Sequence, residues 1–159
     1  MLSVGMFMPF LFTNAFGVVT KINGAEHEPD ENKMWRVKAL GSWDNLVTVT
    51  SVSDIGRLVA ELVFVRTQVV GVVFARGETI SYARLLEVMQ EELGRDRVEG
   101  ALWRTEILER ELEDEPGNGL RKYRVVFANG RGVSWGEGVE GEWGVSMMGV
   151  GEWVRGNLK

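Results

Sequence analysis

The residues best suited to acid–base chemistry are one histidine and two tyrosines. His27 is the only histidine, and it lies among Glu26, Glu28, Asp30 and Glu31. Nearby carboxylates favour the charged imidazolium and so raise a histidine pKa, which would suit His27 to general acid–base catalysis. A solvated loop histidine is the simpler interpretation. No metal site is expected, because one histidine with carboxylates on a polar loop offers no rigid ligand geometry.

The two phenols are candidate proton donors. Tyr82 falls on the apolar stripe of a predicted helix, so Tyr123 is the better candidate for a catalytic acid. A serine triad is not expected, because the chain has no GxSxG nucleophile elbow. The string GRGVSWG at residues 130–136 superficially resembles a dinucleotide-binding turn. Only 23 residues follow it, too few for the rest of a βαβ unit of about 30 residues, so a glycine-rich loop is expected here and not a phosphate-binding turn.

Apolar side chains crowd the N-terminal segment and predict a pocket for an apolar small-molecule substrate. Pockets of this kind hold their ligands with mostly hydrophobic and aromatic walls and a few polar groups. Ordinary core packing is the alternative for the same side chains. The candidate substrate-binding residues are Met6, Phe7, Met8, Phe10, Phe12, Trp35 and Trp103.

Strands and helices alternate in the periodicity of residues 46–112. Residues 47–50 predict a half-buried strand, and an apolar stripe over residues 55–63 predicts a helix capped by Ser53 or Asp54. The β-branched run 69–74 predicts a second strand. A helix follows from Tyr82 to a stop at Gly94, then a strand over 98–103 and a helix from Thr105 to Leu112. This order predicts βαβ-type crossovers and an α/β or α+β fold.

Length and composition predict one compact domain over residues 1–159. Acidic residues exceed basic ones, 23 to 18, and the net charge of −5 is not gathered into blocks of one sign. Nucleic acid and anionic membranes are therefore not expected partners. The apolar start of the chain is too short to span a bilayer. The absence of cysteine is compatible with a reducing compartment, and a cytoplasmic protein is expected.

Four segments together carry a resemblance to a known family. They are LVTVTSVSDIGRLVAELVF (46–64), VVFARGETISYARLLEV (72–88), KYRVVFANGRGVSW (122–135) and GEWVRGNLK (151–159). The pattern resembles the NmrA-like, isoflavone-reductase-like branch of the short-chain dehydrogenase superfamily, and its fungal members in particular. The resemblance implies a substrate-binding half without the Rossmann nucleotide-binding half. The family's glycine-rich turn and active-site lysine would then lie before Met1.

The resemblance also carries implications for single segments. Residues 123–128 read locally as a strand, but the family implies a helix there, which we favour. In the family, the stretch matching residues 6–12 lines the substrate cleft, and Pro9 stands where many relatives place an acidic residue. A lobe without its cofactor half would expose an apolar face, so we expect a homodimer, in which N-terminal segments could be exchanged.

Three functions follow as hypotheses. The first is a cofactor-independent enzyme of fungal secondary metabolism, a cyclase, isomerase or dehydratase acting on an apolar intermediate. Such catalysis needs mainly shape, orientation and one or two hydrogen-bond donors. The second is a non-catalytic regulatory or binding protein of the NmrA type. The third is a reductase fragment that a separate nucleotide-binding chain completes.

Overall fold

The β structure forms three small sheets. The computed structural model describes residues 1–22, 34–131 and 133–158. One sheet has the order β3 (Val19–Lys21), β4 (Trp35–Leu40), β8 (Val98–Trp103). The second has the order β2 (Met6–Phe7), β5 (Leu46–Thr50), β7 (Glu78–Ser81), and a third pairs β1 (Leu2–Ser3) with β6 (Val73–Phe74). The fold is mixed α/β, as predicted.

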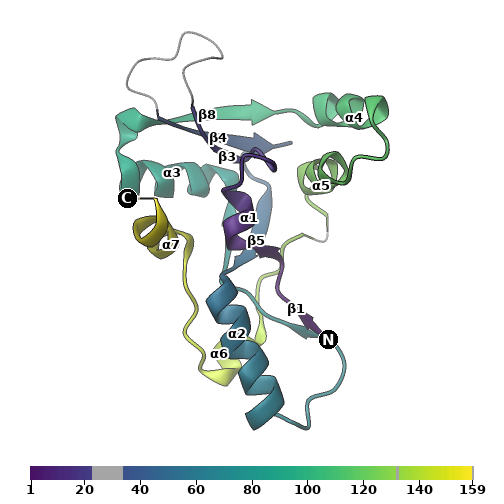
Figure 1. The fold of residues 1–159 in the computed structure, drawn as a ribbon, viewed down its shortest axis with the longest axis vertical. Helices are drawn as coiled ribbons and strands as arrows, with labels where there is room; N and C mark the ends of the chain where they lie inside the picture. Colours follow the sequence, from purple (N-terminus) through teal and green to yellow (C-terminus); the bar gives the residue numbers. More distant parts are fainter. Residues whose placement is uncertain (23–33, 132, 159) are drawn as a thin grey trace.

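Helices cover the sheets on several sides (Figure 1). α3 (Tyr82–Leu93) packs on β4 and β8, and α7 (Val150–Asn157) packs on α3. α4 (Thr105–Asp114) packs against α5 (Gly119–Ala128), which contacts β4. α2 (Val52–Ala60) continues as a π-helical turn, η1 (Glu61–Val65), and reaches away from the sheets. The short helices are α1 (Met8–Leu11), the 3₁₀ turn η2 (Arg95–Arg97) and α6 (Val139–Trp143).

Several predicted elements are confirmed. The helix ended by Gly94 is α3, and residues 98–103 form β8. The strand over residues 47–50 is β5, but it is not half-buried as predicted, because all four of these residues are buried. The helix favoured over residues 123–128 is α5. Gly94 ends α3 with a φ of 105°, a conformation that glycine adopts without steric cost.

Three predictions about local structure need correction. Ser51 caps α2, because its hydroxyl accepts from the Asp54 amide at 3.1 Å, so neither Ser53 nor Asp54 is the cap. The strand expected over residues 69–74 is confined to β6. β5 and β6 lie in different sheets, so α2 does not join them by the expected crossover within one sheet, whereas β4 and β8 are parallel neighbours.

Three carboxylates fix the C-terminal segment to the rest of the fold. The fully buried Asp54 carboxylate accepts from the Met148 amide at 2.9 Å and pairs with Arg57. The carboxylate of Glu78 accepts from the Val150 amide at 2.7 Å, at the start of α7. Glu140 pairs with Arg76 at 3.0 Å. Asp54 thus has a structural role, because it joins the start of α2 to the C-terminal segment and does not act as the predicted helix cap.

Within the described ranges, no helix has both the length and the apolar character needed to cross a bilayer.

Candidate ligand-binding groove

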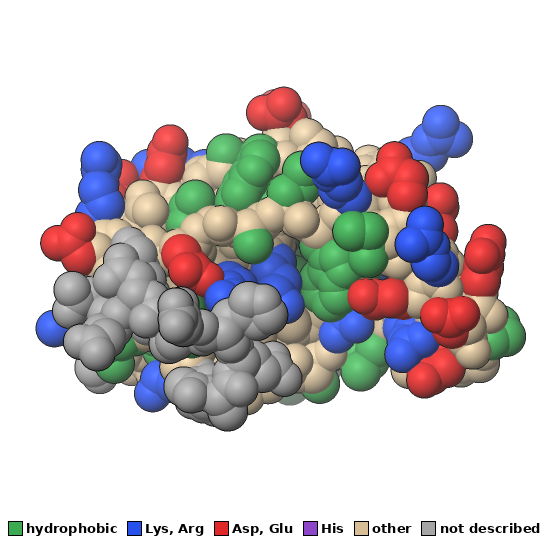
Figure 2. Space-filling model, turned by 90° about the horizontal axis from the view of Figure 1, so that it is seen from above, with side chains coloured by type: hydrophobic (Ala, Val, Ile, Leu, Met, Phe, Trp, Pro, Cys, Tyr) green, Lys and Arg blue, Asp and Glu red, His purple; other side chains and the backbone are tan. Residues whose placement is uncertain are grey.

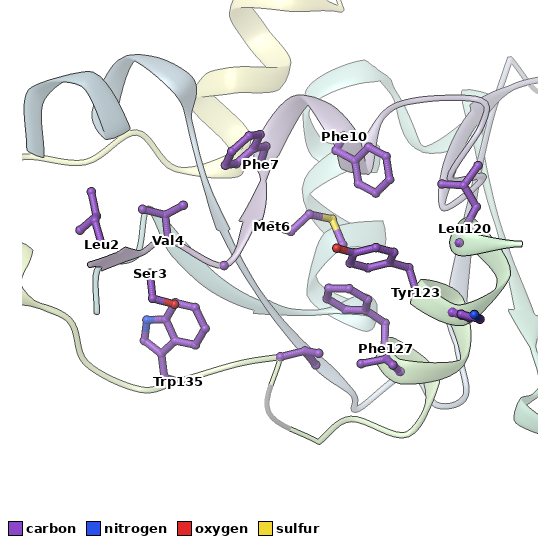
Figure 3. A pocket seen from close by; sticks show the side chains of 15 residues that line it. Leu2, Ser3, Val4, Met6, Phe7, Phe10, Leu120, Tyr123, Phe127 and Trp135 are labelled. Atoms are coloured by element: carbon purple, nitrogen blue, oxygen red, sulfur yellow. The ribbon is translucent and has the colours of Figure 1, made fainter. Parts of the chain in front are cut away.

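A groove of about 990 Å³ lies between the N-terminal strands and α5 (Figure 3). Residues 2–7 form one wall, together with Phe10 of α1. The facing wall comes from α5 and from the loop that follows it. The lining residues are Leu2, Ser3, Val4, Gly5, Met6, Phe7, Phe10, Gly119, Leu120, Lys122, Tyr123, Val126, Phe127, Val133 and Trp135.

The N-terminal wall changes partner strand at Gly5. β1 runs parallel to β6, and β2 runs parallel to β5. Between them, Gly5 has a φ of 68°, and a methyl group at this position would collide with the Thr48 carbonyl. The Thr50 hydroxyl donates to the Val4 carbonyl at 2.6 Å and holds the bend. Glycine is therefore required where the wall turns.

A closed ring of hydrogen bonds places Trp135 at the groove. The hydroxyls of Thr48 and Thr79 lie 2.7 Å apart, and Thr79 donates to the Trp135 carbonyl at 2.7 Å. The Trp135 amide donates back to the Thr48 hydroxyl at 3.1 Å. The Trp135 ring then meets Phe74 edge-on, with 5.5 Å between centroids. Thr48 of β5 and Thr79 of β7 thus fix the position of the loop that carries Trp135, although this loop is distant from both strands in the sequence.

Aromatic packing supports the groove from below. Phe16 is fully buried, stacks on Phe10 at 4.8 Å between centroids, and meets Phe127 edge-on at 5.8 Å. Phe127 stacks in turn with Tyr123 at 6.5 Å. Two of the lining rings therefore rest on one buried side chain, Phe16, which does not line the groove itself.

Polar contacts at both ends orient α5. At its start, the Asn118 side chain accepts from the amides of Leu120 and Arg121 at 3.1 and 3.2 Å. At its end, the Asn45 amide group donates to the Ala128 carbonyl at 2.7 Å. Arg124 donates to the Phe16 carbonyl at 2.9 Å. These contacts fix the helix that carries Tyr123.

The structure brings four of the predicted site residues together and places others elsewhere. Met6, Phe7, Phe10 and Tyr123 line the groove. His27 lies outside the described residues. The other predicted lining residues have structural surroundings. Met8 is fully buried, Phe12 stacks on Trp153 at 4.3 Å, Trp35 lies under Lys21, and Trp103 lies between Lys38 and Arg124.

Sequence reasoning missed the groove residues of α5 other than Tyr123. Val126 and Phe127 follow Tyr123 by three and four positions, which is the spacing of one helix face. That signal was present once residues 123–128 were expected to be helical. No comparable pattern identified Trp135. It lies in a glycine-rich loop, which has no periodicity that predicts where a side chain points.

The groove offers few groups for chemistry. Among the lining residues that the structure describes, the polar side-chain functions are those of Ser3, Lys122, Tyr123 and the indole of Trp135, and none is a carboxylate or a histidine. The Tyr123 side chain is 58% exposed, and its ring lies between Met6 and Phe127 (Figure 3). No three histidine, aspartate or glutamate side chains of the described part of the chain gather as metal ligands. The groove thus combines apolar binding with proton donation.

The other tyrosine lies in the core. Tyr82 is fully buried at the start of α3, where burial raises the pKa of its phenol, and its hydroxyl has no partner among the described residues. It does not line the groove. Its position agrees with the prediction that Tyr82 belongs to an apolar stripe.

The residues around the glycine string do not fit a dinucleotide. A dinucleotide turn follows a strand and opens a helix whose first amides meet the pyrophosphate. Here, Gly130 follows the helix α5 with a φ of 65°, and no helix begins before Val139 among the described residues. We therefore assign no nucleotide to this turn.

Charges of both signs are interspersed over the face of the molecule in Figure 2, with apolar side chains between them. That face shows no extended area of a single sign.

Comparisons with known proteins agree with this architecture. No protein-family model matches the chain. A curated NmrA-like family domain-containing oxidoreductase of Gibberella moniliformis is 35% identical over 156 residues, covering 96% of this chain and 47% of that protein. The crystal structure of isoflavone reductase superposes with a TM-score of 0.68 at 11% identity, covering 98% of this chain and 51% of that one.

A second solved structure gives the same result. A nucleoside-diphosphate-sugar epimerase from Staphylococcus aureus superposes with a TM-score of 0.66 at 15% identity, covering 97% of this chain and 50% of that one. The chain thus shares the fold of these structures and spans about half the length of the relatives it matches.

Proposed function

Because the chain corresponds, as predicted, to about half of an NmrA-like, isoflavone-reductase-like protein, we propose that it binds an apolar small molecule in the groove and transforms it without a nicotinamide cofactor. The reaction class is cyclisation, isomerisation or dehydration of an intermediate of fungal secondary metabolism. One observation carries this proposal: the groove has the volume of a small-molecule site, about 300–1,000 Å³, and predominantly apolar walls.

Tyr123 is the proposed proton donor. Its ring stacks against Phe127, so the phenol is held at the groove wall. Cyclisation proceeds when a substrate is held in one reactive conformation. In enone isomerisation, the Tyr123 hydroxyl would donate to the substrate carbonyl oxygen and stabilise the dienolate, while a water molecule accepts the proton from the α carbon and a proton is returned to the γ carbon. His27 remains proposed as a second acid–base group.

Replacing Tyr123 with phenylalanine should lower turnover by about 100-fold or more, because the proton donor is lost while the ring is kept. Conversion of β,γ-unsaturated cyclic ketones to their conjugated isomers, followed by ultraviolet absorbance, provides the assay. Tyr82→Phe is the matched control: it removes an unpartnered buried hydroxyl outside the groove and should leave turnover unchanged. Unchanged rates in Tyr123→Phe and in His27→Ala would remove both proposed catalysts.

Calorimetric titration with NADPH tests the cofactor-free proposal. We expect no heat of binding from the folded chain. Micromolar binding of NADPH would contradict the cofactor-free proposal and indicate that the protein is a reductase. Binding that appears only after addition of a separate nucleotide-binding chain would favour the fragment hypothesis.

A second function is favoured by an exposed apolar surface whose residues do not line the groove. It lies on η1 and on the loop leading to β6, and we call it the distal patch. Phe64 is 80% exposed and Val70 is 90% exposed. No charged residue occurs between Thr67 and Ala75. Such a surface fits a regulatory protein that acts by contact with another chain. The residues of the distal patch are Val63, Phe64, Val65, Val69, Val70 and Val72.

We propose a second copy of the chain as the occupant of the distal patch. The patch is uncharged, and its border carries charges of both signs: Arg66 lies over the Trp143 ring at 4.9 Å, and Glu142 lies beside Val69 and Val70. In a twofold contact, the Arg66 of each copy can meet the Glu142 of the other. This complementarity offsets the repulsion between two chains of net charge −5.

The double replacement Phe64→Lys with Val70→Lys should convert a dimer into a monomer, because it places charges in an apolar contact. Light scattering during gel filtration gives the mass. Val126→Lys, on α5 outside the patch, is the control and should leave the dimer intact. A wild-type monomer at micromolar concentration would contradict the proposal.

A further inference from the structure

The charge of the groove differs from that of the molecule as a whole. The chain carries a net charge of −5, yet the described residues that line its groove include no carboxylate and a single cation, Lys122. An exposed cation at the edge of an apolar wall can attract an anionic group while the apolar body of the same molecule lies against the wall.

The neighbouring cations of α5, Arg121 and Arg124, make contacts within the fold, whereas the Lys122 side chain does not. Arg121 donates to the Glu111 carbonyl and pairs with Glu115 at 3.1 Å. Arg124 donates to the carbonyls of Ala15 and Phe16. Lys122 is exposed, and its side chain has no hydrogen bond or ion pair with any residue that the structure describes.

We propose that the ligand of the groove is an apolar acid, whose carboxylate is bound by Lys122 while its body lies against the aromatic walls. This inference rests on the proposed function and specifies its substrate class. The Tyr123 hydroxyl, on the neighbouring residue, is then placed to reach a second oxygen of the same molecule. The aromatic walls of Phe10, Phe127 and Trp135 favour a flat or conjugated body.

Two fluorescent probes with one aromatic body separate charge from apolar binding. They are 1-anilinonaphthalene-8-sulfonate, an anion, and N-phenyl-1-naphthylamine, its neutral counterpart. Both should bind the wild-type chain. Lys122→Met should lower the affinity for the anionic probe by about three- to tenfold at low salt and leave the affinity for the neutral probe unchanged. Lys122→Arg keeps the charge and should keep the affinity for the anionic probe. 2-Naphthoate should displace both probes better than 2-naphthamide does.

Control variants locate the effect. Lys21→Met removes the same charge outside the groove and should change neither affinity. Val70→Asp, on the distal patch, should also leave both affinities unchanged, which shows that the probes occupy the groove. If both probes bind and Lys122→Met weakens them equally or not at all, the inference is overturned while groove binding stands. If neither probe binds, the proposed function fails as well.

Discussion

Replacing Phe16 with alanine is expected to lower the free energy of unfolding by about 3–5 kcal/mol, because it leaves a cavity where a fully buried ring stood. The ring also supports two groove residues, Phe10 and Phe127. The variant should therefore lose probe binding at temperatures where it is still folded. Urea denaturation measures the first effect, and N-phenyl-1-naphthylamine fluorescence measures the second.

The control for this prediction is the same substitution on the surface. Phe64→Ala removes a ring that is 80% exposed, so a monomeric sample should change in stability by no more than about 0.5 kcal/mol. Equal losses in Phe16→Ala and Phe64→Ala would show that Phe16 does not support the core as its burial indicates.

Replacing Gly5 with alanine is expected to lower the free energy of unfolding by about 2–4 kcal/mol. The added methyl group would collide with the Thr48 carbonyl, and a φ of 68° is strained for alanine. The backbone must then shift where β1 passes into β2, so this groove wall should also move. Thermal unfolding should show a lower Tm, and amide exchange should be faster at Val49 and Val73.

Gly56→Ala is the matched control for Gly5→Ala. Gly56 lies inside α2 with open space around its Cα, so a methyl group there relieves the entropic cost of glycine and should stabilise by about 0.5–1 kcal/mol. The two glycine variants should thus move Tm in opposite directions. A neutral Gly5→Ala would show that the wall tolerates a different path.

Two elements were predictable from sequence for different reasons. α3 was predicted because burial on one side imposes a helical period on its residues. β5 was predicted from its β-branched residues, although residues 47–50 are buried on both faces. The strand predicted over residues 69–74 was too long for a physical reason. Its valines are β-branched, but most of them are exposed, and only Val73 and Phe74 pair with another strand. Strand propensity alone does not supply the partner.

The candidate site was predictable only in part, for a related reason. Apolar residue types indicate burial, but they do not say whether a side chain meets the core or an open groove. Phe7 and Phe10 therefore line the groove, while Met8, between them in sequence, is fully buried in the core. The contribution of Trp135 depends on hydroxyl contacts between Thr48 and Thr79, which join segments far apart in the chain.

The two walls of the groove come from opposite ends of the chain, and this separation has a consequence during synthesis. Residues 2–10 leave the ribosome long before α5 and Trp135 exist to cover them. Until then, Phe10 can already stack on Phe16 and β2 can pair with β5, but the facing wall is absent. Contacts between such distant segments form late, because closing a long loop costs entropy before the contact can stabilise it. We therefore expect groove formation as one of the last steps of folding.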